Sequence, residues 1–329
     1  MVEVKRKAKI IPMTAPLLRL PGERAPAAGD AEWYAGADGI RLRAALFPAK
    51  TPIGSVVIST GRTEFIEKYL EVAAELVGRG YTVLVHDWRG QGLSTRLLPD
   101  RLKGHAAGYE AFVADHTALL DAFQDRLPKP WIGLSHSMGG CLTAMALARG
   151  ETRYAACILS APMWGISGLP RGVAHAVAAA MVAMGRSNDY AFGANDPYSI
   201  LYDTERLTHD RVRYDRARSQ ILALRDLALG AITWGWIKTS FDAIAWLHRA
   251  KEVTQITTPM VVLSAGEEKI VDNRGARLVA GRIPSARYME VPGAYHEILM
   301  ETDDIRAIFW REFDALSAEV LSEAISPRR

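Results

Sequence analysis

The turn between residues 130–134 and 141–149 constrains this chain more than any other segment. The first range predicts a short buried strand, and the second predicts a helix. Ser137 lies between them, with the small residues Ser135 and Gly139 two positions before and after it. A strand that passes so abruptly into a helix strains its central residue and admits only small neighbours. The pattern is typical of an elbow that presents a nucleophilic serine.

Predicted strands alternate with predicted helices along most of the chain. After a hairpin expected over residues 32–47, buried strands are predicted at residues 55–60, 81–86, 154–161, 259–264 and 286–291. Helical spacing is found at residues 67–77, 107–123 and 302–325. Continuous Val- and Ile-rich strands alternating with amphipathic helices predict an α/β fold, with a mostly parallel sheet covered by helices on both faces.

Residues 164–253, which we call the insertion, interrupt this alternation. They have helical patterns but no convincing strand, and they hold four of the eight tryptophans: Trp164, Trp234, Trp236 and Trp246. We interpret the insertion as a helical cap over the strand ends where the elbow lies. The alternative is that these tryptophans only pack the insertion against the core. The predicted organisation is an N-terminal arm (1–30), a core (31–163 and 254–329) and the cap.

Composition narrows the class of protein. The 329 residues are 49% hydrophobic and 23% charged, as in ordinary globular enzymes, and the net charge of +3 is too small to indicate a nucleic-acid partner. The two cysteines, Cys141 and Cys157, lie in apolar segments, so we expect reduced core residues and neither a disulfide nor a metal site. Without a leader or a membrane-spanning stretch, we expect a cytoplasmic protein.

The elbow serine needs a general base and an acid that orients the base. His296 follows the last predicted strand and precedes the closing helix, the place from which a base reaches the elbow. Three acids follow the strand at residues 259–264, namely Glu267, Glu268 and Asp272. We favour Glu268, because Asp272 stands where it would cap the next helix, but Asp272 stays open as the alternative.

An oxyanion hole needs two backbone N–H groups. Met138, directly after the serine, supplies one, and Arg62, after the glycine at position 61, is the candidate for the other. The Arg62 side chain is either a surface charge or a contact for an anionic head group. Residues 87–94 form a Gly-rich loop without the spacing that a dinucleotide requires, so we assign it to the scaffold and expect no cofactor.

Residues 60–64, 86–94 and 293–297, together with the elbow, resemble motifs of α/β-hydrolase-fold serine hydrolases, in the branch of bacterial lysophospholipases and monoacylglycerol lipases. In the insertion, residues 207–210 and 233–236 resemble the bacterial lysophospholipases in particular. The family's acid position falls on Glu268, where monoacylglycerol lipases carry Asp. Thr60 stands where the family commonly has His.

The resemblance implies hydrolysis of carboxylic esters of single-chain lipids, either lysophospholipids or monoacylglycerols, through an acyl-enzyme on Ser137. The alternatives are acyl transfer, an aminopeptidase-type reaction with the same catalytic residues, and a lipid-binding relative. The expected partner is a small-molecule lipid ester. Residues 173–184 are apolar on nearly every side, which predicts either burial within the cap or peripheral contact with the inner membrane face.

Overall fold

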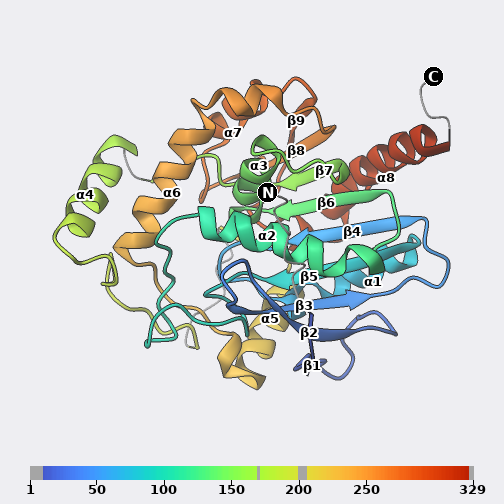
Figure 1. The fold of residues 1–329 in the computed structure, drawn as a ribbon, viewed down its shortest axis with the longest axis horizontal. Helices are drawn as coiled ribbons and strands as arrows, with labels where there is room; N and C mark the ends of the chain where they lie inside the picture. The colour runs from blue at the N-terminus through green and yellow to red at the C-terminus, as the bar shows by residue number, and fades with distance from the viewer. Residues whose placement is uncertain (1–9, 169–170, 199–205, 326–329) are drawn as a thin grey trace, which may run out of the picture.

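A nine-stranded sheet forms the centre of the molecule (Figure 1). The computed structural model describes residues 10–168, 171–198 and 206–325. The strand order is β1-β2-β3-β5-β4-β6-β7-β8-β9; the pairs from β1 to β5 are antiparallel, and all pairs from β5 onward are parallel. The predicted α/β fold with a mostly parallel sheet is therefore confirmed. The strands are β1 (Ile10–Ala15), β2 (Asp30–Ala35), β3 (Arg41–Phe47), β4 (Gly54–Ser59), β5 (Tyr81–Asp87), β6 (Trp131–His136), β7 (Tyr154–Ser160), β8 (Met260–Ala265) and β9 (Ala286–Val291).

The N-terminal segment differs from its prediction. Residues 1–30 were expected as an arm outside the folded core, but β1 pairs antiparallel with β2, with Thr14 opposite Glu32. The Pro in this strand lacks a backbone N–H, which an edge strand tolerates because one side of it faces no neighbour. Residues 1–9 of the predicted arm lie outside the described residues. The arm assignment therefore does not hold for β1.

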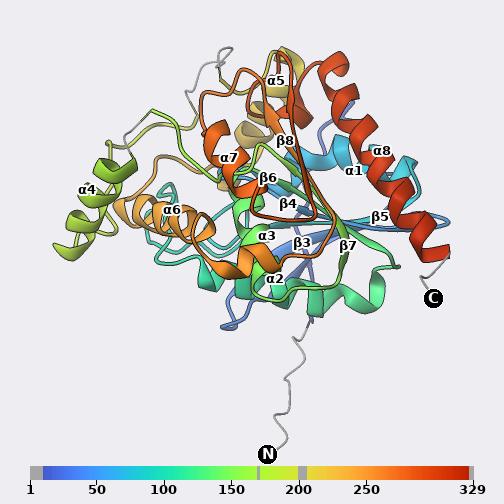
Figure 2. The same ribbon diagram turned by 90° about the horizontal axis from the view of Figure 1, so that it is seen from above.

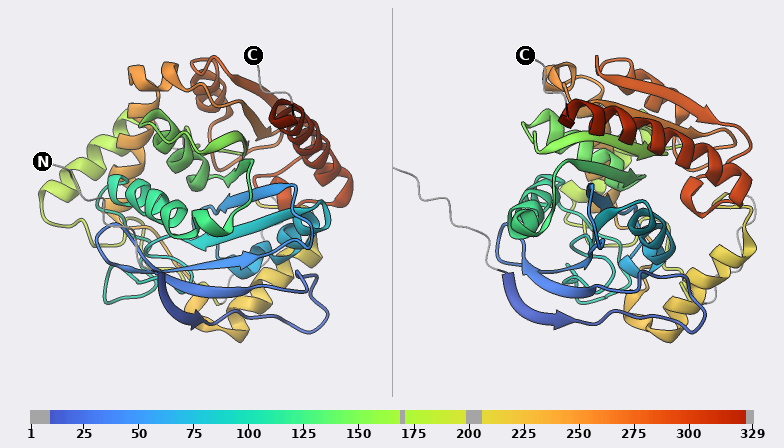
Figure 3. Two further views of the ribbon diagram at one scale, coloured as in Figure 1. Left: turned by 45° about the vertical axis from the view of Figure 1, so that its right-hand side comes forward. Right: turned by 90° about the vertical axis from the view of Figure 1, so that its right-hand side faces the viewer.

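Helices cover both faces of the sheet, as Figure 3 shows for α1 and α2. Successive side chains of a strand point to opposite faces, and in β4 Val57 packs under one helix layer while Val56 and Ile58 pack under the other. The helices α1 (Leu70–Gly78) and α8 (Asp303–Ile325) cover one face. The other face is covered by α2 (Glu110–Phe123), α3 (Met138–Ala148) and α7 (Asn273–Ala280).

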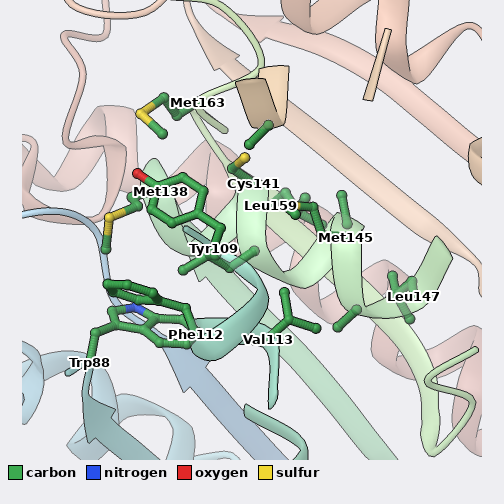
Figure 4. Packing of buried hydrophobic residues seen from close by; sticks show 14 of the residues in the cluster. Trp88, Tyr109, Phe112, Val113, Met138, Cys141, Met145, Leu147, Leu159 and Met163 are labelled. Atoms are coloured by element: carbon green, nitrogen blue, oxygen red, sulfur yellow. The ribbon is translucent and has the colours of Figure 1, made fainter. Parts of the chain in front are cut away.

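Buried side chains around its N-terminus hold α3, the helix that follows the elbow. Figure 4 shows Met138 and Cys141 of α3 beside Phe112 of α2 and Tyr109, the residue before α2, with Trp88 next to them. All five side chains are buried. Because a close-packed interior allows little displacement, this packing holds the N-terminus of α3 in place.

The insertion lies between β7 and β8. Its helices are α4 (Arg171–Ala183), α5 (Arg211–Ala223) and α6 (Trp234–Leu247), with short 3-10 helices η3 (Arg225–Leu227) and η4 (Lys251–Gln255). Its described residues, 164–168, 171–198 and 206–253, add no strand to the sheet. Helix α6 packs on α3, α4 packs on α6 at the margin of the molecule (Figures 1 and 2), and α5 contacts the 3-10 helix η1 (Ile66–Tyr69). Trp164 and Trp236 of the insertion belong to the buried core cluster, and Trp234 and Trp246 are partly buried and pack against it.

Candidate active site

The elbow has the strained geometry that its sequence predicts. Strand β6 passes directly into α3, and Ser137 between them has φ 50° and ψ −115°. A positive φ is costly for a residue with a side chain and persists only where the surroundings impose it. A Cβ at Gly139 would collide with the carbonyl oxygen of Ser59 in β4, so this position requires glycine. The Ser135 hydroxyl lies 2.8 Å from the Thr143 hydroxyl of α3 and joins the strand to the helix.

A chain of two hydrogen bonds joins Ser137, His296 and Glu268. The Ser137 Oγ lies 3.0 Å from His296 Nε2, and His296 Nδ1 lies 2.8 Å from Glu268 Oε2. Ser137 and His296 are only 7% and 4% exposed. A neutral His296 that donates from Nδ1 to the carboxylate presents the lone pair of Nε2 to the serine hydroxyl. The arrangement can therefore accept the serine proton.

Glu268 is held as a carboxylate. Its Oε1 accepts hydrogen bonds from the backbone N–H groups of residues 269, 270 and 271, at 3.0, 2.8 and 3.2 Å. Burial alone would raise the pKa of Glu268. His296 and these N–H groups lower it by more than burial raises it, so the pKa of Glu268 lies below its usual value. Asp272 instead accepts the N–H of Arg274 at 3.0 Å and caps α7. Glu267 is exposed.

The loop after β4 carries Arg62, the second predicted oxyanion donor, and Glu64 and Gln91 hold it. The Gly61 N–H donates to Glu64, and Gln91 bonds both the Gly61 carbonyl and the Thr63 N–H at 3.0 Å. Gln91 belongs to the Gly-rich loop that the sequence assigned to the scaffold. The guanidinium of Arg62 is buried against Trp236, 5.4 Å from its ring, and donates to the Gly230 carbonyl, so it is not a surface charge. Met138, the other predicted donor, opens α3.

A second buried His–Glu pair next to these residues was missed in the sequence. His136 Nδ1 lies 3.0 Å from Glu64 Oε2, and His136 Nε2 lies 3.2 Å from the backbone carbonyl of His296. Because both neighbours only accept hydrogen bonds, both ring nitrogens must donate, and His136 is an imidazolium. Burial lowers the pKa of His136, but the charge of Glu64 outweighs burial and raises it. The missed signal was that a histidine on a buried strand requires polar partners.

Lys68 extends this network. Its ammonium lies 3.0 Å from Glu64 and 2.6 Å from Glu297, the residue after His296. Burial raises the pKa of Glu64, whereas His136 and Lys68 together lower it well below its usual value. The network therefore connects the oxyanion loop to the histidine loop through charged side chains.

The insertion contacts the histidine loop through backbone hydrogen bonds. The His296 N–H donates to the Arg206 carbonyl at 3.2 Å, and the Glu297 N–H donates to the Leu207 carbonyl at 2.9 Å. The space between Met138, Arg62 and Trp236 is a void of about 10 Å³. Of two larger cavities, of about 450 and 410 Å³, neither is lined by Ser137 or His296, but the second shares Arg62 with this void. Ser137 and His296 themselves are buried, at 7% and 4% exposure.

Two further features bear on the kind of protein. Within the described residues, no group of three His, Cys, Asp or Glu side chains is arranged to hold a metal ion. No helix among these residues is sufficiently long and apolar to cross a bilayer.

Comparisons with known proteins agree on the fold and on the chemistry. A family model described as Serine aminopeptidase, S33 matches residues 50–303. Lysophospholipase L2 of Escherichia coli is 34% identical over 287 residues, covering 84% of this chain and 83% of the relative. Monoacylglycerol lipase of Mycolicibacterium smegmatis is 26% identical over 281 residues, covering 82% and 91%. A soluble variant of monoglyceride lipase from Saccharomyces cerevisiae has a TM-score of 0.71 at 19% identity, covering 91% of this chain and 98% of its own, and confirms the α/β-hydrolase fold.

Proposed function

Because this chain belongs to the serine aminopeptidase S33 family of α/β hydrolases, we propose that it hydrolyses carboxylic esters of single-chain lipids through an acyl-enzyme on Ser137. The observation that carries the proposal is the hydrogen-bonded series Ser137–His296–Glu268 at the elbow. The relatives named lysophospholipase and monoacylglycerol lipase support a lipid ester as the substrate.

The reaction follows from the geometry of these side chains. His296 Nε2 takes the proton of Ser137 as Oγ attacks the ester carbonyl, and Glu268 stabilises the imidazolium that forms. The backbone N–H groups of Met138 and Arg62 are the proposed donors to the oxyanion. His296 then protonates the leaving alcohol, and water attacks the acyl-enzyme by the same route in reverse, releasing the fatty acid.

An aminopeptidase reaction fits the surroundings of the site poorly. Its substrate carries a cationic α-amine, which requires a carboxylate near the scissile bond. The cavity of about 410 Å³ beside the oxyanion loop is lined by four cationic side chains and one carboxylate, Glu297, which already pairs with Lys68. Acyl transfer would use the same acyl-enzyme and differs only in the acceptor.

We also propose that the insertion, residues 164–253, is the cap of the site. Its helix α4 would contact a lipid surface, either a micelle or the inner face of the membrane. Ala174 and Ala178 of α4 are buried, whereas Val173 and Val177 are 61% and 44% exposed. These exposed valines, one turn apart on an apolar helix, support contact with lipid. The position of α4 at the margin of the molecule leaves this face open (Figure 2).

The test is a labelled fluorophosphonate on the intact protein, followed by turnover of a lysophospholipid, a monoacylglycerol and an aminoacyl amide. We expect stoichiometric labelling of Ser137 and release of fatty acid from the lipid esters. Turnover of the amide in preference to both esters would overturn the proposed function. Transfer of the acyl group to added glycerol at a higher rate than to water would replace hydrolysis by acyl transfer.

A further inference from the structure

A cavity of about 410 Å³ lies between α5 of the insertion and the oxyanion loop. Arg62 and Glu297 both line it. The backbone N–H of Arg62 is a proposed oxyanion donor, and Glu297 directly follows the catalytic His296 in the sequence. Its cationic lining residues are Arg62, Lys68, Arg213 and Arg218. The apolar part of the wall includes Phe65, Leu207, Ile221, Leu229 and Ile232. The cavity is therefore amphipathic, with a positively charged polar part.

Two of the four cations are neutralised within the protein. Lys68 pairs with Glu297 and Glu64, at 2.6 and 3.0 Å. Arg213 pairs with carboxylates of α1, of the N-cap residue of its own helix (Asp210) and of α8, at 2.7 to 2.9 Å. The positive charges of Lys68 and Arg213 are therefore balanced by carboxylates of the protein itself.

Arg218 and Arg62 differ from this pair. Among the described residues, neither guanidinium has a carboxylate partner, and the Nε of each is buried without a hydrogen-bond acceptor. Burial lowers the pKa of Arg62 to about 10, which reflects the cost of holding its charge away from water. Both side chains are partly buried, and charges held away from water are generally paired, so two guanidiniums without a carboxylate on one cavity favour an anion that is supplied from outside.

We propose that this cavity binds the phosphate of a lysophospholipid head group, with Arg218 and Arg62 as its ligands. The inference rests on the proposed function and makes the substrate more specific. A guanidinium presents a planar set of N–H donors that matches two phosphate oxygens, and two such groups can hold a phosphodiester from two sides. The apolar part of the wall suits the glycerol carbons next to the ester. A monoacylglycerol has no anion to offer, so the cavity favours lysophospholipids.

The experiment compares two esters with the same acyl chain, 1-octanoyl lysophosphatidylcholine and 1-octanoylglycerol, both below their critical micelle concentrations. Using monomeric substrates removes any contribution from attraction to a charged interface. The variants are Arg218→Gln, Arg218→Lys and the control Arg211→Gln. Arg211 lies on the same helix but its side chain is 62% exposed, and it does not line the cavity.

The readout is the ratio of kcat/KM for the phospholipid to that for the glyceride. In Arg218→Gln we expect this ratio to fall on the order of tenfold to a hundredfold, mainly through KM, because a charge-assisted hydrogen bond to the phosphate is lost. Arg218→Lys should recover part of the ratio, and Arg211→Gln should leave it at the wild-type value. Glycerophosphocholine should inhibit the wild type competitively and should inhibit Arg218→Gln more weakly.

The outcomes separate this inference from the proposed function. If the wild-type protein cleaves neither ester, the proposed function fails. If it cleaves both but Arg218→Gln leaves the ratio unchanged, or lowers both rates equally, the phosphate site is wrong and the hydrolase stands. A melting temperature for each variant identifies a general loss of folding.

Discussion

At the residue scale, Ser137 combines a strained backbone with a hydrogen-bonded base. We predict that Ser137→Ala lowers turnover by several orders of magnitude, on the order of the 10⁶-fold known for serine loss in subtilisin. The melting temperature should not fall, because alanine removes one hydroxyl and keeps the Cβ. The measurement is steady-state turnover together with fluorophosphonate labelling. Labelling that survives in the variant would assign the nucleophile elsewhere.

Glu268 and Asp272 have separable tasks. Glu268→Gln should lower kcat by about 10⁴-fold, as for an amide in place of the triad acid, because His296 loses the carboxylate that fixes its tautomer. Asp272→Asn should leave turnover near wild type, and should cost at most about 1 kcal/mol of stability, because Asn caps a helix as well as Asp. The reverse order of the two turnover numbers would make Asp272 the acid.

The His136–Glu64 pair should give stability a defined pH dependence. The pKa of His136 is raised from its usual 6.5, so its contribution is complete below pH 6.5 and is lost as pH rises through the raised pKa. The pKa of Glu64 is lowered, so its contribution is lost only on acidification through that lowered pKa. We predict that the melting temperature of wild type exceeds that of His136→Gln most near pH 6 and by less near pH 9. In a Glu64→Gln background, the effect of His136→Gln on the melting temperature should no longer depend on pH in this way. A wild-type minus His136→Gln difference that stays constant from pH 6 to 9 would contradict the charged pair.

At the element scale, α4 is a helix whose existence the sequence predicts but whose buried face it does not. Its residues predict an apolar helix, but not which side is covered. Its burial on α6 through Ala174 and Ala178 is a tertiary fact, and the exposed valines follow from it. We predict that Val173→Asp/Val177→Asp lowers turnover of a long-chain micellar ester by roughly tenfold, through lost burial of two apolar side chains in lipid.

The same double variant should leave a soluble short-chain ester unaffected. Leu278→Asp serves as the control, because Leu278 is an exposed apolar residue on α7, outside the insertion. Equal losses on both substrates, with a lower melting temperature, would show that the valines only support the fold.

The buried strands and the elbow could be predicted because their signals are local. The runs at β4, β5 and β8 are continuous and apolar, and His296 directly follows the last strand. Other features depend on distant partners. Glu64 and His136 are 72 positions apart, and only the sheet brings them together. The strand β1 was missed because a short apolar run beside lysines has no periodicity to distinguish it, and its pairing with β2 decides its structure.

At the scale of the whole molecule, charged side chains fasten the insertion to the core. Arg213 and Arg216 of α5 bond Glu71 of α1, at 2.9 and 2.6 Å. Burial raises the pKa of Glu71, yet these arginines lower it to about 2. Its stabilising contribution is therefore complete above pH 4.5 and is lost as pH falls through about 2.

We predict that Glu71→Gln destabilises the protein by up to about 3 kcal/mol at pH 7, because two arginines lose their shared carboxylate. The control is Glu110→Gln, which removes an exposed ion pair with Arg149 and should change stability by less than about 1 kcal/mol. Chemical denaturation at pH 7 and pH 4 measures both. Equal stabilities of Glu71→Gln and wild type at pH 7 would show that this contact does not secure the insertion.

The backbone bonds from His296 and Glu297 to residues 206 and 207 couple two parts of the chain that are far apart in the sequence. If that part of the insertion were displaced, both bonds would break and the histidine loop would lose two of its supports. The position of the loop that carries His296 is thus tied to the position of residues 206 and 207 of the insertion. A substitution that displaces these two residues should therefore disturb the histidine loop as well.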